Sequence, residues 1–278
     1  MTSFSGKTAY ITGAAGAIGR GLARAFAEQG VNVALADIQP EPLALACREM
    51  SELGVEAVPF VVDVADRDRC YAVADQVEKR FGKVHFVVNN AGIGHVGVPF
   101  DRIPDADFDW LFSVNVFGVI NGTKAFLPKL LSHGEGGHII NTSSAAGLWT
   151  QRGWDVGLYS ATKKSIFALS EGLRDAVSSK GIGVSVLFPG YVVGNLGPNS
   201  VKLRPSGNGP APVPVIPAGL SADHGMDPNL VGRLAVRAIQ DRQFHVITHP
   251  DLRPDYEASV SELRAAFDWT DRILPQLS

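Results

Sequence analysis

The sequence has few cysteines, no excess of positive charge and no long apolar run. Cys47 and Cys70 are the only cysteines in 278 residues. They fit neither a disulfide framework nor a zinc site, which favours a reducing, cytoplasmic location. No apolar stretch reaches the roughly 18–20 residues that a membrane helix needs. The N-terminus also lacks the basic and apolar regions of a signal peptide, so we expect no membrane association.

Acidic and basic residues nearly balance, and the histidines lack the spacing of metal ligands. The chain has 25 Lys and Arg against 28 Asp and Glu, a formal net charge of −3. Nucleic acids and anionic membranes are bound through clustered cations, and no such cluster occurs, so neither is expected as a partner. The seven histidines show no HExxH or similar pattern, and we expect no metal site.

Short apolar runs alternate with longer amphipathic stretches from one end of the chain to the other. The runs predicted as buried strands are 8–12, 31–36, 58–62, 84–88, 138–141, 184–188 and 244–248. The stretches predicted as helices are 18–29, 66–80, 107–131, 157–180 and 228–240. This alternation predicts an α/β fold, a doubly wound (Rossmann) seven-stranded parallel sheet with strand order 3-2-1-4-5-6-7.

The composition changes in only one internal segment. Residues 194–224 hold six prolines among glycines and asparagines. This segment is too long for an ordinary connection between two elements. We expect a substrate loop at about 194–225 and a C-terminal extension at about 250–278. No linker separates two cores, so a single domain over 1–278 is predicted.

A glycine-rich turn follows the first predicted strand. It reads TGAAGAIG over residues 12–19, directly before a predicted helix. Glycines allow a sharp turn close to a pyrophosphate, and the helix N-terminus offers backbone N–H groups to the phosphates. A tight strand-to-helix turn of no further function would look the same. The residues predicted to bind a dinucleotide here are Gly13, Gly16, Ala17, Ile18 and Gly19.

An acidic residue ends the second predicted strand. Asp37 lies 18 residues after Gly19, where a carboxylate accepts hydrogen bonds from the ribose hydroxyls of NAD and repels a 2′-phosphate. Positions 14–17 and 38–40 hold no Arg or Lys. A helix-capping aspartate is the alternative for Asp37, but together with the turn it favours NAD as the cofactor.

Polar and small residues follow the third and fourth predicted strands. In a doubly wound sheet, ligands bind beyond the carboxyl ends of the strands. The residues expected at the adenosine are Asp63, Val64, Asn90, Ala91 and Gly92. Either segment alone would also serve as an ordinary turn.

Tyr159 and Lys163 lie four residues apart at the start of a predicted helix. Residues at this spacing share a helix face. A free tyrosine has a pKa of about 10 and is a poor base at neutral pH, but a neighbouring cation stabilises its phenolate. The spacing alone occurs often on helix surfaces. Its place after Asn141-Thr142-Ser143-Ser144 favours a catalytic pair.

These motifs, in this order, resemble the short-chain dehydrogenase/reductase family over nearly the whole chain. The residues that carry the resemblance are TGAAGAIG, Asp37, Asp63-Val64, NNAG, Asn115, Ser143-Ser144, YSATK and Pro189-Gly190. The resemblance implies an NAD-dependent alcohol dehydrogenase or ketone reductase. It also implies a catalytic tetrad of Asn115, Ser144, Tyr159 and Lys163.

Each tetrad residue has a role that follows from the resemblance. Tyr159 is expected to take the alcohol proton, or to donate it to a ketone in reverse, and Ser144 to hold the substrate oxygen. Lys163 is expected to bind the nicotinamide ribose and lower the tyrosine pKa. Asn115 is expected to bend its helix and position a water. The resemblance places Pro189, Gly190 and Val192 beside the nicotinamide.

The sequence departs from the family pattern in three places. Ala17 stands where glycine is usual. The interval from Ser144 to Tyr159 is 15 residues, about two more than usual, so Ser143 remains an alternative for the serine role. Gly194 replaces a common threonine, so the carboxamide is expected to rely on the Val192 backbone and on Asn195.

The substrate is expected to be a bulky aryl secondary alcohol. The segments DFDW, NVFGVINGTKAFLPKLL, GIGVSVLFPG and Leu203-Arg204-Pro205 resemble the Cα-dehydrogenases that oxidise benzylic alcohols in lignin-derived aryl ethers. Trp149 and Trp154 offer flat apolar walls for such a substrate. Local packing of a long loop explains these tryptophans equally well.

Two other functions remain open at the level of sequence. An NADP-dependent 3-oxoacyl reductase is disfavoured by Asp37 and by the long loop. A non-catalytic NAD-sensing regulator is disfavoured by the intact Tyr159 and Lys163. By resemblance, helices 107–131 and 157–180 would pair in a homodimer or homotetramer. Val114, Phe117, Gly118 and Phe126 fit that pairing, but they fit core packing equally well.

Overall fold

The centre of the structure is a parallel sheet of seven strands, in the order β3-β2-β1-β4-β5-β6-β7. This computed structural model describes residues 4–209 and 225–277. The strands are β1 (Thr8–Thr12), β2 (Asn32–Asp37), β3 (Ala57–Val61), β4 (Phe86–Asn89), β5 (Gly137–Thr142), β6 (Ile182–Phe188) and β7 (His245–Ile247). The predicted fold class and strand order are confirmed.

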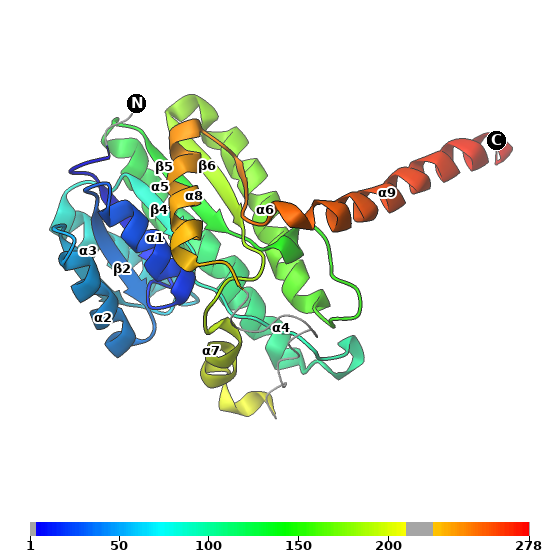
Figure 1. Cartoon of the computed structure of the whole chain (residues 1–278), viewed down its shortest axis with the longest axis horizontal. Helices are drawn as coiled ribbons and strands as arrows, with labels where there is room; N and C mark the ends of the chain where they lie inside the picture. The colour runs from blue at the N-terminus through cyan, green and yellow to red at the C-terminus, as the bar shows by residue number, and fades with distance from the viewer. Residues whose placement is uncertain (1–3, 210–224, 278) are drawn as a thin grey trace. The chain divides into compact units, whose positions relative to one another are not determined.

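Helices cover both faces of the sheet (Figure 1). The helices packed on the sheet are α1 (Ala17–Ala27), α2 (Pro40–Ser51), α3 (Arg67–Phe81), α5 (Gly118–Ser132), α6 (Gly157–Val177) and α8 (Pro228–Asp241). The described residues also form α4 (Asp105–Phe112), α7 (Leu196–Leu203) and α9 (Arg253–Ile273). Strands enclosed in this way bury both faces, which is why they read as continuous apolar runs.

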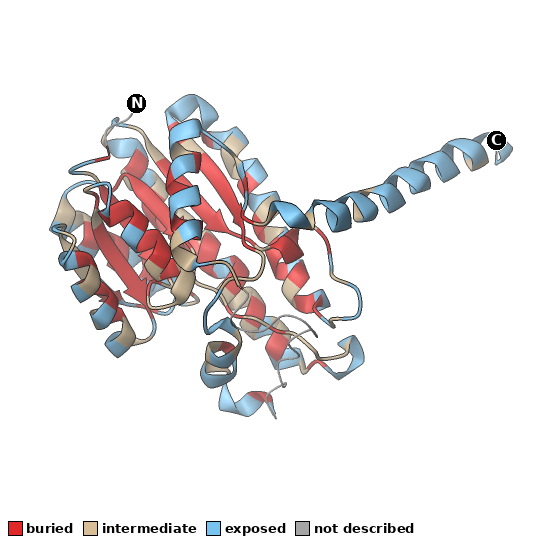
Figure 2. Cartoon of the chain, viewed as in Figure 1, coloured by how far each residue is buried: buried red, intermediate tan, exposed pale blue. Residues whose placement is uncertain are grey.

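Two apolar layers hold these helices on the sheet. On one face Leu22, Leu43 and Val231, from α1, α2 and α8, pack with the strands. On the other face Cys70 of α3 and Phe126 of α5 do the same. Figure 2 shows the strands and the inner sides of these helices as the buried part of the chain.

Among the described residues, three α-helices lie where no helix was predicted. α2 follows β2, α7 lies inside the predicted substrate loop, and α9 lies in the predicted C-terminal extension. The base of the loop is closed by a parallel bridge between Val192 and Met226. The prolines 210, 212, 214 and 217 lie outside the described residues.

The chain divides into two compact units, Met1–Thr248 and His249–Ser278. The first contains the whole sheet, and the second contains α9. That the two form a single domain stays a prediction. Among the described residues, no helix is both long enough and apolar enough to cross a bilayer.

Candidate active site

The turn between β1 and α1 requires glycine at two positions. Gly13 has φ +65°, and a Cβ there would lie 2.8 Å from the Cα of Ala91. A Cβ on Gly19 would lie 2.1 Å from the carbonyl oxygen of Gly13. The first helical residue is Ala17, and no side chain caps this helix at Gly16. The arrangement suits an anion at the helix N-terminus.

Asp37 lies beside this turn, at the end of β2. Its buried carboxylate accepts hydrogen bonds from the backbone N–H of Ala15 and of Gln39, both at 3.0 Å. Burial raises the pKa of this carboxyl group, and the backbone hydrogen bonds oppose the rise. The fold thus places the predicted ribose-binding residue next to the predicted phosphate-binding turn.

A lysine from a distant segment contacts Gln39, two residues after Asp37. The Nζ of Lys202, in α7, donates to the Oε1 of Gln39 at 3.3 Å, across 163 positions of sequence. At the same helix, the Ser200 hydroxyl accepts a hydrogen bond from the backbone N–H of Gly94 at 2.8 Å. α7 therefore links the ends of β2 and β4, and sequence spacing gave no sign that it brings a cation there.

Thr12 joins the ends of β1 and β4. Its Oγ1 accepts hydrogen bonds from the backbone N–H groups of Asn90 at 2.9 Å and Ala91 at 3.0 Å. The Asn90 side chain returns a bond to the Thr12 carbonyl oxygen at 3.0 Å. Thr12 was not among the residues predicted for the site, although it is the first residue of the TGAAGAIG turn.

Asp63 and Val64 follow β3 at the same edge. Asp63 is exposed and accepts a hydrogen bond from the backbone N–H of Ala65 at 2.9 Å. Val64 is buried, and its carbonyl oxygen accepts a bond from the Asn121 side chain at 2.9 Å. This leaves the Asp63 carboxylate open to solvent beside the strand ends.

Asn115 lies in a π-helical turn, Ser113–Phe117, between α4 and α5. Its buried side chain accepts from the backbone N–H of Ile93 at 2.8 Å. It donates to the Ile93 carbonyl oxygen at 3.0 Å and to the Thr162 hydroxyl at 3.1 Å. Asn115 thus ties the segment after β4 to α6, at a point where the helix changes its hydrogen-bonding pattern.

Gly92 brings Asn115 and Lys163 together. A Cβ at this position would lie 3.2 Å from both the Asn115 Oδ1 and the Lys163 Nζ. Most Cβ contacts are longer than this, so any other residue here would require Asn115 or Lys163 to move slightly, and glycine lets the end of β4 lie against both polar groups.

Lys163 is buried close to Tyr159. Its Nζ donates to the carbonyl oxygen of Thr142 at 3.1 Å and lies 5.7 Å from the centroid of the Tyr159 ring. Burial lowers the pKa of Lys163 to about 8. At neutral pH the ammonium form still predominates, so a cation faces the phenol.

Tyr159 and Ser144 form the polar contact expected for proton transfer. Burial raises the pKa of the Tyr159 phenol, and a hydrogen bond with the Ser144 side chain opposes the rise. The Ser143 hydroxyl instead donates to the backbone carbonyl of Lys163 at 2.7 Å, and Ser143 is buried. Of the two candidate serines, Ser144 is therefore the one beside the phenol.

Residues 189–194 lie between Ser144 and the start of α1. The Pro189 carbonyl oxygen accepts a hydrogen bond from the backbone N–H of Ala145 at 2.8 Å. The Gly190 N–H donates to the Thr248 hydroxyl at 3.2 Å. A Cβ on Gly194 would lie 2.7 Å from the Cβ of Ala17. The two positions at which the sequence departs from the family pattern, Ala17 and Gly194, therefore lie side by side.

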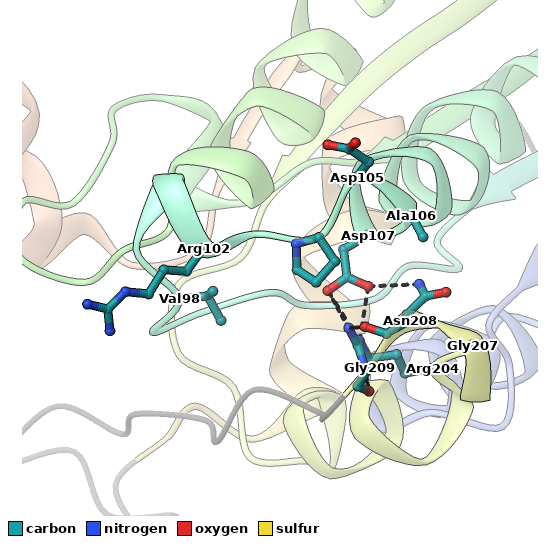
Figure 3. Close-up of a pocket in the computed structure, with 10 residues that line it drawn as sticks. Val98, Arg102, Asp105, Ala106, Asp107, Arg204, Gly207, Asn208 and Gly209 are labelled. Carbon is teal, nitrogen blue, oxygen red and sulfur yellow. Dashed lines mark hydrogen bonds and ion pairs between the residues drawn. The ribbon is translucent and has the colours of Figure 1, made fainter.

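A cavity of about 690 Å³ opens between α4 and the segment after α7 (Figure 3). Val98 and Arg102 line one part of it, and Arg204 and Asn208 line another. Val98 and Tyr159 pack against the same apolar cluster, which includes Leu158. This cluster connects the cavity wall to the catalytic candidates.

A buried polar network fixes one wall of this cavity. The Asp107 carboxylate accepts from the Arg204 Nη2 at 2.9 Å and from the Asn208 Nδ2 at 2.8 Å, and it lies 3.2 Å from the His95 Nε2. Burial alone would raise the pKa of Asp107, but the bonds from Arg204 and Asn208 outweigh it and lower the pKa. The network attaches residues 204–208 to α4.

The two tryptophans predicted to bind substrate differ in exposure. Trp149 is buried, which leaves it little surface for a ligand. Trp154 is partly exposed, and its carbonyl oxygen accepts a hydrogen bond from the Gly97 N–H at 3.1 Å. Trp154 is therefore the better placed of the two, because Gly97 precedes the cavity residue Val98.

The described residues contain no group of three or more His, Cys, Asp or Glu side chains arranged to hold a metal ion. What the site gathers is a phosphate-binding turn with a carboxylate beside it, and a Tyr–Ser–Lys group at the same edge of the sheet. Such a set can bind a dinucleotide and transfer a proton.

Comparison with known proteins gives the same assignment. Residues 7–202 match the family described as short chain dehydrogenase. A C alpha-dehydrogenase of Sphingobium sp. strain SYK-6 is 32% identical over 263 residues, 92% of this chain and 85% of its own length.

Two solved structures cover nearly the whole chain. A short chain dehydrogenase/reductase from Burkholderia phymatum in complex with NAD matches with a TM-score of 0.87 and 30% identity, over 96% of this chain and 97% of that one. The apo form of LigO from Sphingobium sp. strain SYK-6 matches with a TM-score of 0.82 and 31% identity, over 98% and 92%. The family match covers more than half of the chain and a 32% identical relative covers nearly all of it, so this chain belongs to the short-chain dehydrogenase family of oxidoreductases.

Proposed function

We propose that this chain oxidises a bulky aryl secondary alcohol to a ketone with NAD as the hydride acceptor. The observation that carries the proposal is the meeting of Tyr159, Ser144 and Lys163 at the edge of the sheet that holds the glycine turn. A proton-transfer group and a dinucleotide site are the two parts that alcohol oxidation requires.

The residues present fit a bound NAD. The turn from Gly13 to Gly19 is so tight that a Cβ at either end would clash with the backbone of Ala91 or of Gly13, and Asp37 lies next to it for the ribose hydroxyls. Asp63, Val64, Asn90, Ala91 and Gly92 would hold the adenosine, and Pro189, Gly190 and Val192 would hold the nicotinamide. NAD, when bound, accepts the hydride from the carbinol carbon.

The chain's own groups move the proton. Ser144 holds the substrate hydroxyl toward the phenol oxygen of Tyr159, which takes the proton as the carbinol carbon loses its hydride. The Lys163 ammonium stabilises the phenolate, because a nearby cation favours the charged form. Asn115, through its bonds to Ile93 and Thr162, fixes the α6 segment between Tyr159 and Lys163.

The size of the cavity supports a bulky substrate. Its volume of about 690 Å³ falls within the range of small-molecule sites, roughly 300–1,000 Å³. Trp154, whose carbonyl oxygen bonds to Gly97 next to the cavity residue Val98, would supply an aromatic surface near this cavity. The similarity to a C alpha-dehydrogenase, together with the resemblance of this chain's segments to the aryl-ether Cα-dehydrogenases, favours an aryl carbinol over an aliphatic one.

We further propose a cytoplasmic homodimer or homotetramer built in part on the surfaces of α5 and α6. Phe117, Leu131 and Leu169 are exposed apolar residues near or on these helices, which supports an interface there. Phe126, by contrast, is part of the core.

A substrate panel with purified protein tests the proposal. In steady-state assays with NAD, kcat/KM for 1-aryl secondary alcohols should be at least about tenfold higher than for short aliphatic alcohols. A tenfold ratio corresponds to roughly 1.4 kcal/mol of additional binding free energy. A preference for small aliphatic or steroid alcohols contradicts the substrate assignment. Absence of NADH formation with every alcohol contradicts the dehydrogenase assignment.

A further inference from the structure

Helix α9 carries a row of exposed apolar side chains. None of its residues is buried, and Figure 2 shows it mainly in the colour of exposed residues. Leu263, Phe267, Leu274 and Leu277, in α9 and the turn that follows it, have exposed fractions between 63% and 78%. Apolar side chains gathered on one surface usually mark a binding site.

The spacing of this row is that of a coiled coil. Val260, Leu263, Phe267, Thr270, Leu274 and Leu277 follow one another at intervals of three, four, three, four and three residues. The mean of 3.5 keeps these side chains on one stripe that faces a second helix. We call Val260, Leu263, Phe267, Leu274 and Leu277 the apolar seam.

The charges on α9 argue against a membrane as the partner. The helix holds three arginines and five carboxylates between Arg253 and Ile273. Helices that lie on membranes usually carry Lys and Arg on their polar face, because the lipid surface is anionic. An acidic helix with a heptad seam instead fits another helix.

We propose that α9 pairs in antiparallel orientation with α9 of a second copy of this chain. If Leu263 packs against Leu274 of the second copy, Arg264 lies beside Asp271 of the second copy. The two-fold symmetry of such a pair forms this contact twice. Opposite charges thus flank the seam at both ends of the contact.

Other pairings of the same helix are less favourable. A parallel pair places Arg264 beside Ser259 and Asp271 beside Ala266, so neither charge is compensated. An antiparallel pair shifted by one heptad brings the two copies of Arg264 together. A shift by a second heptad places Glu257 beside Arg264 but leaves Leu274 and Leu277 uncovered.

Substitutions in the seam of the full-length protein test the pairing. Light scattering after size-exclusion chromatography should show that Leu263→Asp with Phe267→Asp lowers the mass of the wild-type assembly by a factor of two or more. The matched control, Ala258→Asp with Ala265→Asp, changes the opposite face and should leave the mass unchanged. Equal masses for wild type and seam variant, or a monomeric wild type, overturn the proposal.

Charge reversal tests the orientation. Arg264→Asp should raise the dissociation constant of the α9 contact about tenfold, because two favourable contacts become repulsive. Adding Asp271→Arg to the same chain should restore the constant to within about threefold. If the single variant has no effect, or if the double variant is as weak as the single one, the antiparallel pairing is wrong. Circular dichroism and dehydrogenase activity show that each variant is folded.

Discussion

The Nζ atom of Lys163 lies 5.7 Å from the centroid of the Tyr159 ring and is held there by the carbonyl oxygen of Thr142 at 3.1 Å. The contact places a cation beside the phenol that also bonds to Ser144. Burial raises the pKa of this phenol, and a nearby cation and a hydrogen bond are the interactions that favour its phenolate form.

Replacing Tyr159 by Phe removes the proton acceptor and leaves the ring. We expect kcat for alcohol oxidation to fall by about 10²–10⁴, the usual contribution of a general base. The Kd for NAD, measured by calorimetry, should change little. Tyr71→Phe, on the exposed surface of α3, is the matched control and should keep full activity. A Tyr159→Phe enzyme with wild-type kcat would remove Tyr159 from the mechanism.

Lys163 should make stability depend on alkaline pH. Its pKa is about 8 in the folded chain and about 10.4 when unfolded, so between these values the unfolded chain binds more protons. The free energy of unfolding should therefore rise from pH 8 to 10, by about 2 kcal/mol relative to Lys163→Met. Urea unfolding across this range checks the slope. If the free energy of unfolding of the wild type parallels that of Lys163→Met at every pH, the pKa of Lys163 is not lowered by burial.

Asp37 and Lys202 should have opposite effects on cofactor choice. Wild type is expected to prefer NAD, and Asp37→Ala should lower the ratio of kcat/KM for NAD over NADP by about 10², the effect of removing a carboxylate that repels the 2′-phosphate. In that background, Lys202→Met should cost several-fold in kcat/KM for NADP only, because the cation beside Gln39 is lost. A wild-type preference for NADP would refute the assignment of Asp37.

The buried pair of Asp107 and Arg204 should hold the wall of the cavity in Figure 3, which we propose receives the substrate. Both side chains are almost fully buried, and removing one partner of such a pair costs about 3–5 kcal/mol. Arg204→Met should therefore lower the melting temperature and raise KM for the alcohol more than KM for NAD. The double variant Asp107→Leu/Arg204→Met should be more stable than the single one. Equal effects on both KM values would mean that the pair supports the whole fold rather than this wall.

The sequence predicted those features that depend on neighbouring residues. Strand order followed from the alternation of apolar runs and amphipathic stretches. Local sequence patterns predicted the glycine turn, Asp37 and the Tyr159–Lys163 pair, because each pattern spans only a few residues. Asp37 is an example, because the strand that ends with it fixes its place at the edge of the sheet.

Features that depend on distant contacts were not predictable. Lys202 reaches Gln39 across 163 positions, and Arg204 meets Asp107 across 97. Both contacts depend on the path of the segment after β6, which no local pattern encodes. The burial of Trp149 was not predictable either, because the sequence does not show whether an aromatic residue near a site is exposed to a ligand.

The most direct test of the proposed reaction is to follow the hydride. The enzyme is incubated with NAD and a 1-aryl secondary alcohol deuterated at the carbinol carbon, and the cofactor is then examined by mass spectrometry. We predict reduced cofactor that carries one deuterium, formed in step with the ketone and lost in Tyr159→Phe. Reduced cofactor without deuterium, or ketone formed without reduction of NAD, would contradict hydride transfer at this site.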